Sequence, residues 1–124
     1  MTHQVQFIWH FHQPDYGLPG GERALLPWVR LHATKAYYDM GRLLEEHEGV
    51  AATINFSGVL LRQLRELVEL GRRDAWWDLT LAHAGRLSVG QKRMLLRYFF
   101  SIDWDTCVRP HQRYAELLDR KSVM

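Results

Sequence analysis

Two histidines separated by a single residue are the side chains of this sequence best placed to do chemistry. His10 and His12 lie at the end of residues 5–12, a run rich in β-forming side chains that predicts a strand. Residues i and i+2 of a strand point to the same face, so the two imidazoles would lie side by side at its carboxyl end. Ligands bind at that end in barrels and open α/β sheets. The pair could therefore bind a metal, orient a sugar hydroxyl or hold a carboxylate, or bond neighbouring loops as structural histidines.

Zinc is the main alternative ligand for the pair. A zinc site needs three or four His, Cys or carboxylate ligands, and Asp15, next to the following turn, could be the third. The remaining histidines form no H-x-x-x-H arrangement. Nucleophilic chemistry has less support, because there is no G-x-S-x-G motif and no base that the sequence places beside Cys107. Residues 17–21 are glycine-rich but match neither the dinucleotide nor the Walker pattern.

The segments that must position the histidines follow a βα pattern. Apolar side chains at helical spacing predict a helix over residues 31–47, and β-forming residues predict a second strand over residues 50–56. Ser57 is a suitable N-cap for a helix over residues 58–70, which Gly71 would end. Strand, helix, strand and helix in this order indicate an α/β fold with a parallel sheet.

The rest of the sequence is different in character. It predicts three helices and no strand, with breaks at Gly85 and over residues 103–110. These helices span residues 74–84, 88–101 and 110–120. We therefore divide the chain into a βαβα unit, residues 1–71, and a helical segment, residues 72–124. Two parallel strands alone leave an exposed edge and an uncovered face, which is unfavourable, so we expect the chain to be part of a larger domain.

Composition excludes several classes of function. The chain is 47% hydrophobic and 24% charged, as globular domains are. Its net charge of +2 comes from scattered residues, which argues against a nucleic-acid partner, because such a partner needs a basic patch. One cysteine allows no internal disulfide and fits a reducing compartment. With no signal-peptide pattern and no apolar run of about 18 residues, we expect a soluble, cytoplasmic protein without a membrane partner.

The histidine segment resembles a known family. Residues 7–14, FIWHFHQP, are similar to the first conserved region of glycoside hydrolase family 57, an H-x-H-Q-P-type element on the first strand. Residues 26–35, LPWVRLHATK, resemble the first loop and helix of the amylase-like branch. Residues 53–57, TINFS, together with Leu60, Leu61 and Gln63, resemble its second strand and helix. Residues 112–117, QRYAEL, resemble the helix before the second conserved region. The resemblance identifies residues 1–124 as the N-terminal part of the catalytic domain.

This resemblance implies the N-terminal portion of a (β/α)7 barrel, an incomplete TIM-like barrel. It also implies a retaining glycoside hydrolase acting on α-glucans such as starch or glycogen, with no metal and no cofactor. Retaining hydrolysis uses two carboxyl groups about 5 Å apart. In the family these are a Glu nucleophile and an Asp acid/base on later strands. No catalytic residue is therefore expected here, since none of the candidate carboxylates matches either motif: Asp15, Glu22, Asp39, Asp103 and Asp105.

The resemblance carries over a set of substrate-binding residues. His10 and His12 match the positions that line the subsite beside the nucleophile, where they would hydrogen-bond sugar hydroxyls. Trp28 and Arg30, in the adjoining loop, are further expected glucan contacts, and Asn55 points from the second strand toward the same rim. Gln13 and Pro14 are expected to shape the turn rather than to touch sugar.

Three functional hypotheses follow. The first is a fragment of an α-glucan hydrolase, amylopullulanase or glucanotransferase whose partners are the glucan and the remaining barrel segment, and which is inactive alone. The second is a non-catalytic remnant that binds glucan or another partner through the same histidines. The third is a metal-dependent hydrolase centred on His10, His12 and Asp15.

Overall fold

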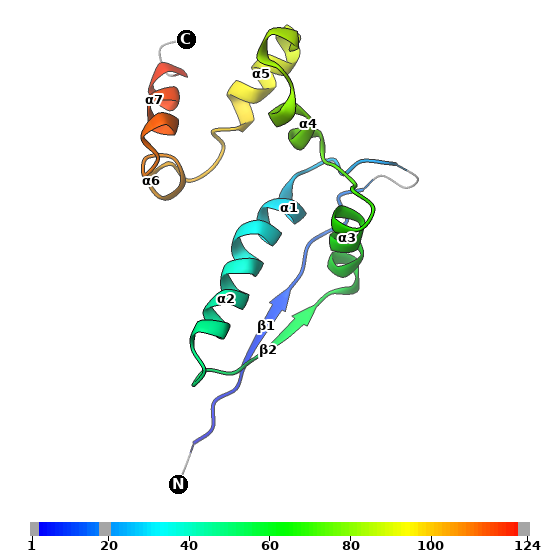
Figure 1. Cartoon of the computed structure of the whole chain (residues 1–124), viewed down its shortest axis with the longest axis vertical. Helices are drawn as coiled ribbons and strands as arrows, with labels where there is room; N and C mark the ends of the chain where they lie inside the picture. The colour runs from blue at the N-terminus through cyan, green and yellow to red at the C-terminus, as the bar shows by residue number, and fades with distance from the viewer. Residues whose placement is uncertain (1–2, 18–20, 122–124) are drawn as a thin grey trace. The chain divides into compact units, whose positions relative to one another are not determined.

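The first of two packing units contains a small parallel sheet. The computed structural model describes residues 3–17 and 21–121, and the chain packs as two units, Met1–Asp78 and Leu79–Met124. The strands are β1 (Phe7–Phe11) and β2 (Ala52–Phe56), which run parallel (Figure 1). Beyond β2 the described residues form no further strand. The predicted α/β class with two parallel strands is confirmed.

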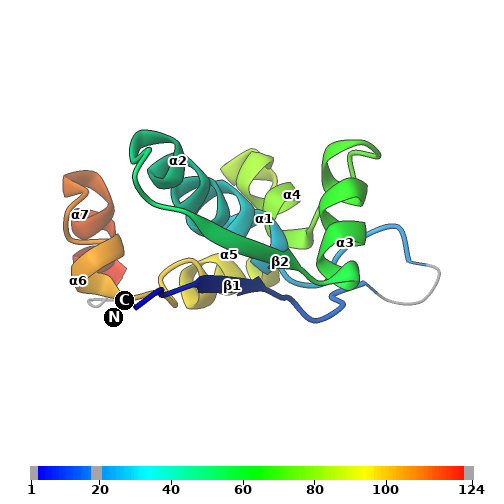
Figure 2. The same ribbon diagram turned by 90° about the horizontal axis from the view of Figure 1, so that it is seen from below.

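A continuous helical run connects the strands and covers one face of the sheet (Figure 2). It consists of α1 (Trp28–His32), a π-helical turn (Ala33–Tyr37) and α2 (Tyr38–Glu46). The sequence predicted a helix over residues 31–47. The run begins three residues earlier because the carbonyl of Pro27 accepts a hydrogen bond from the amide of Leu31 at 3.0 Å. Proline at a helix start costs little, since the first helical N–H groups have no intrahelical partner.

Helix α3 (Gly58–Val68) begins where the sequence predicted and ends two residues before the predicted end at residue 70. The hydroxyl of Ser57 accepts a hydrogen bond from the amide of Leu60 at 3.3 Å, which makes it the N-cap. Gly71 adopts a φ of 63°, in the left-handed region that glycine tolerates without steric cost. The chain therefore turns sharply there.

An apolar core on the helical side of the sheet holds the first unit together. Phe11, Val29 and Leu60 are buried and in contact, and so join β1, α1 and α3. The Phe11 ring stacks on that of Tyr37 at 4.5 Å and meets that of Phe56 edge-on at 5.0 Å. Partly buried side chains complete this core: Trp9, Tyr16, Met40, Ile54 and Leu64.

The second unit is built from short helices around its own core. Its elements, beginning with a helix that crosses the boundary, are α4 (Ala75–Leu81), η2 (Ala84–Arg86), α5 (Val89–Tyr98), α6 (Trp104–Cys107) and α7 (Gln112–Lys121). The three predicted helices are present but shorter. Helix α6 was not predicted; Asp103 caps it by accepting a hydrogen bond from the Thr106 amide at 2.8 Å. Phe100, Val108 and Leu118 are buried together.

The packing boundary falls after Asp78, whereas the sequence pattern changes at residue 72. The first turn of α4 stays with the first unit because Asp74 pairs with Arg30 of α1. No helix in the described ranges has the length and apolar character needed to cross a membrane.

The core of the first unit makes a direct stability prediction. Leu60 is 0% exposed and Leu61, next to it on α3, is 51% exposed. Leu60→Ala should lower the free energy of unfolding by about 2–5 kcal/mol. The substitution leaves a cavity that the side chains packed around Leu60 cannot fill. The matched control Leu61→Ala should change it by no more than about 0.5 kcal/mol. Urea unfolding followed by circular dichroism measures both, and equal losses would contradict this core.

Candidate functional site

The face of the sheet opposite the helices carries most of the predicted binding residues. Successive side chains of a strand point to opposite faces. Because Phe11 points into the core, the even-numbered residues of β1 point away from it. We call the side chains on that side of the sheet the open face: Gln6, Ile8, His10, His12, Thr53 and Asn55. His10 and Asn55 are register partners on adjacent strands, and Ile8 is 64% exposed. The structure therefore brings three sequence-predicted residues, His10, His12 and Asn55, onto one face.

The two imidazoles lie side by side, as the two-residue period predicted. Their ring centroids are 6.0 Å apart and their planes differ by 9°. Both residues are exposed, so neither ring is enclosed in the core. A neutral imidazole offers one donor and one acceptor, and the Asn55 amide offers both. Such a row suits a ligand with several hydroxyl groups. None of the six open-face residues has a carboxyl group, so this face alone supplies no carboxyl acid or base.

The turn after His12 is fixed by a hydrogen-bonded side-chain network. The Gln13 amide donates to the Tyr37 hydroxyl at 3.2 Å and accepts from the Tyr16 hydroxyl at 2.9 Å. Burial, and then the nearby Tyr37, raises the pKa of Tyr16, so its hydroxyl keeps the proton that it donates. The expectation that Gln13 shapes the turn is confirmed.

Trp28 and Arg30 lie in helix α1 and not in the loop where the sequence predicted them, and neither belongs to the open face. The Arg30 guanidinium forms a two-pronged ion pair with Asp74, at 2.7 and 3.2 Å, and its Cζ lies 5.2 Å from the centre of the Trp77 ring. Asp74 also accepts a hydrogen bond from the Trp77 amide at 2.8 Å. The Trp28 ring is partly exposed and lies 6.4 Å from that of His32. Arg30 thus joins α1 to the start of α4.

Asp15, the third ligand of the zinc hypothesis, has other partners. One carboxyl oxygen accepts a hydrogen bond from the Gly17 amide at 3.0 Å, and the other lies 2.6 Å from the Arg62 guanidinium. The Gly17 hydrogen bond, followed by the charge of Arg62, holds the pKa of Asp15 below its ordinary value of 3.8. Within residues 3–17 and 21–121, no three His, Cys, Asp or Glu side chains are grouped so as to hold a metal ion. Asp15 instead ties the loop to α3.

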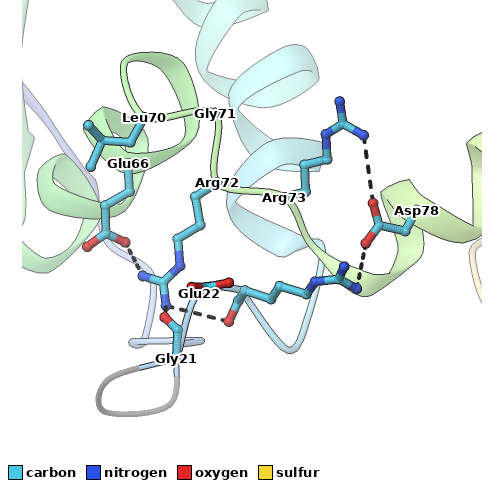
Figure 3. A pocket seen from close by; sticks show the side chains of 9 residues that line it. Gly21, Glu22, Glu66, Leu70, Gly71, Arg72, Arg73 and Asp78 are labelled. Carbon is cyan, nitrogen blue, oxygen red and sulfur yellow. Dashed lines mark hydrogen bonds and ion pairs between the residues drawn. The ribbon is translucent and has the colours of Figure 1, made fainter.

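A charged pocket of about 520 Å³ lies beyond the end of α3 (Figure 3). Its charged lining residues are Glu22, Arg23, Glu66, Arg72, Arg73 and Asp78. Arg72 pairs with Glu66, and Arg23 lies 2.8 Å from Asp78. Burial raises the pKa of Glu66, but hydrogen bonds from Arg72 and Arg62 outweigh this effect and leave that pKa below its ordinary value of 4.5. These charges largely satisfy one another, and none of the lining residues belongs to the open face.

Sequence reasoning gave no role to Gln63, a buried polar residue of α3. A signal was available, because Gln63 lies three residues after Leu60 and four before Leu67, within the apolar stripe of the helix. A polar residue at such a position needs hydrogen-bond partners, which implies a specific contact. Tyr16 and Tyr37 were also missed, since nothing in the sequence shows that their hydroxyls meet at Gln13.

Comparison with known proteins gave one match. The model of glycosyl hydrolase family 57 matches residues 6–121, nearly the whole chain. No curated protein and no solved structure matched the chain.

The Arg30–Asp74 pair predicts a large effect of a single substitution. Asp74→Ala should lower the free energy of unfolding by about 3 kcal/mol, because a partly buried guanidinium loses its partner. Asp74 is 3% exposed, whereas Arg42 and Glu46 form an exposed pair on α2. Glu46→Ala should therefore cost no more than about 0.5 kcal/mol. Chemical denaturation compares the two variants, and a small loss for Asp74→Ala would argue against a structural role for the pair.

The lowered pKa values predict loss of stability in acid. Asp15 and Glu66 each have a folded-state pKa below the ordinary value, 3.8 and 4.5. Their contribution is therefore complete above 4.5 and is lost as the pH falls through the folded pKa values. The melting temperature should decline below pH 4.5, and Glu66→Gln should lessen the decline. Thermal melting across this range measures it; an identical decline in the variant would contradict the assignment.

Proposed function

The chain belongs to glycosyl hydrolase family 57, and on that basis we propose that it is part of an α-glucan-active glycoside hydrolase, to which it supplies substrate-binding histidines. One observation carries the proposal. His10 and His12 present parallel, exposed rings 6.0 Å apart at the carboxyl end of β1, with Asn55 across from His10 on β2. Sugar hydroxyls both donate and accept hydrogen bonds, so they match this row of groups.

The sheet also supports a barrel. One face of β1 and β2 packs against helices, and the other is open, as expected when helices form the outside of a barrel. In this proposal the open face becomes the inner wall of a (β/α)7 barrel, and the remaining barrel segment supplies further strands. Those strands would cover the exposed side chain of Ile8 and pair with the free edges of the sheet.

The proposed role of the histidines is substrate binding during retaining hydrolysis. Positive charge develops on the sugar ring in the transition state, so hydrogen bonds to the sugar hydroxyls become stronger there. These stronger bonds lower the free energy of the transition state relative to the bound substrate. The nucleophile and the acid/base, about 5 Å apart in retaining enzymes, would come from the remaining barrel segment. Two of the candidate carboxylates have structural partners: Asp15 ties the loop to α3, and Asp103 caps α6.

Trp28 and Arg30 have different roles in this proposal. The partly exposed Trp28 ring, at the start of α1, can stack on a sugar at the rim. Arg30 acts mainly through its ion pair with Asp74, which holds the segment after α3 against α1.

A non-catalytic glucan-binding protein is the second candidate. The observation that favours it is the open face itself, which combines exposed hydrogen-bonding groups with no carboxyl group. The two candidates differ in what happens when the remaining barrel segment is added to this chain. An enzyme fragment gains hydrolysis of an α-glucan, whereas a binding protein does not.

Binding of maltopentaose to the full chain tests the feature that both candidate functions share, which is glucan binding by His10 and His12. His10→Ala and His12→Ala should each weaken binding by about tenfold, the effect of one or two lost hydrogen bonds. His3→Ala is the matched control, because His3 is exposed and precedes β1, and it should bind as the unchanged chain does. Isothermal titration calorimetry measures the affinities. Equal affinity in all four proteins would refute a role for the histidine pair.

A further inference from the structure

The strongest unassigned feature near the histidines is the buried amide of Gln63. This side chain comes from α3, is 6% exposed, and faces the loop that follows His12. Its Nε2 donates to the Pro14 carbonyl at 2.8 Å, and its Oε1 accepts from the Tyr16 amide at 3.0 Å. One amide thus bonds the backbone on both sides of Asp15.

A side-chain amide suits this pair of bonds. A side-chain amide has a donor and an acceptor on one planar group, which is what a carbonyl and an N–H two residues apart require. Leucine would fill a similar volume and continue the apolar stripe of α3, but it would leave both backbone groups without this partner. A carboxylate would keep the acceptor for the Tyr16 amide and would lose the donor to Pro14.

The start of α3 also holds the backbone on the N-terminal side of His12. The Ser57 amide, at the N-cap of α3, donates to the Phe11 carbonyl at 3.0 Å. Ser57 therefore anchors the residue before His12, and Gln63 anchors the backbone two residues after it. Between these anchors the backbone of His12 has a set direction, while its ring remains exposed beside that of His10.

We propose that Gln63 is a positioning residue, which sets the direction of the His12 ring relative to His10 by holding Pro14 and Tyr16. Its consequence for glucan binding rests on the proposed function, but its effect on the rings does not. The nearby Arg62–Asp15 ion pair cannot replace it, because both side chains are about half exposed and such pairs hold a loop only weakly.

The test compares Gln63→Leu and Gln63→Glu with the matched control Gln112→Leu in the full chain. Gln112 is exposed on α7, and its amide donates a hydrogen bond to Glu116 in the same helix, at 3.5 Å. Two measurements are made on each protein. NMR records the imidazole resonances of His10 and His12 and the contacts between the rings, and calorimetry records the affinity for maltopentaose.

The expected result separates positioning from folding. Gln63→Leu should shift or broaden the His12 resonances, weaken the inter-ring contacts and lower the affinity by no more than the roughly tenfold expected for His12→Ala, because it misplaces that ring without removing it. Gln63→Glu, which keeps one bond, should give smaller changes in the same direction, and it carries the test if Gln63→Leu does not fold. Gln112→Leu should match the unchanged chain.

Two outcomes decide the matter. Unaltered His12 resonances in both Gln63 variants, with faster exchange of the Tyr16 amide, would overturn the proposal, because the loop would then have loosened without moving the ring. If the unchanged chain fails to bind maltopentaose, the proposed function fails; altered ring contacts in the Gln63 variants would still support the positioning role.

Discussion

Packing of a single face of the two-stranded sheet is the constraint on which the first unit depends. Phe11 enters the core between α1 and α3, and the alternation of the strand then turns His10 and His12 outward. The parallel register adds Asn55 beside His10. Moving β1 by one residue would bury the histidines and expose Phe11, so the same hydrophobic contacts that stabilise the unit also decide which side chains a ligand can meet.

Polar contacts hold the segment after β1, which the hydrophobic core alone does not hold in place. Residues 12–16, which follow β1, form neither helix nor strand, and side chains from the helical layer hold them. Gln13 joins them to Tyr37, and Gln63 bonds their backbone. Buried contacts of this kind hold a segment more firmly than exposed ion pairs do, because an unpaired buried group costs more than an unpaired exposed one. The position of the histidines therefore depends on the packed helical layer behind the sheet.

Local patterns in the sequence predicted most of the elements. Alternating β-formers predicted both strands, helical periodicity predicted α3, and Ser57 marked its start. Helix α6 was missed because it is only four residues long and depends on the Asp103 cap rather than on apolar spacing. The helical run begins before residue 31 because the Pro27 carbonyl accepts a hydrogen bond from the Leu31 amide. Short elements rely on single contacts, which periodicity does not detect.

For the site, the sequence by itself determined which residues share a face and, through the family resemblance, which chemistry they suit. The two-residue period of a strand is local, so His10 and His12 could be paired without a structure. Only the tertiary structure decided that Arg30 pairs with Asp74, that Asp15 pairs with Arg62, and that Gln63 holds the turn. These partners lie 44 to 49 positions apart along the chain, and such distant contacts arise from packing in three dimensions, which no local pattern records.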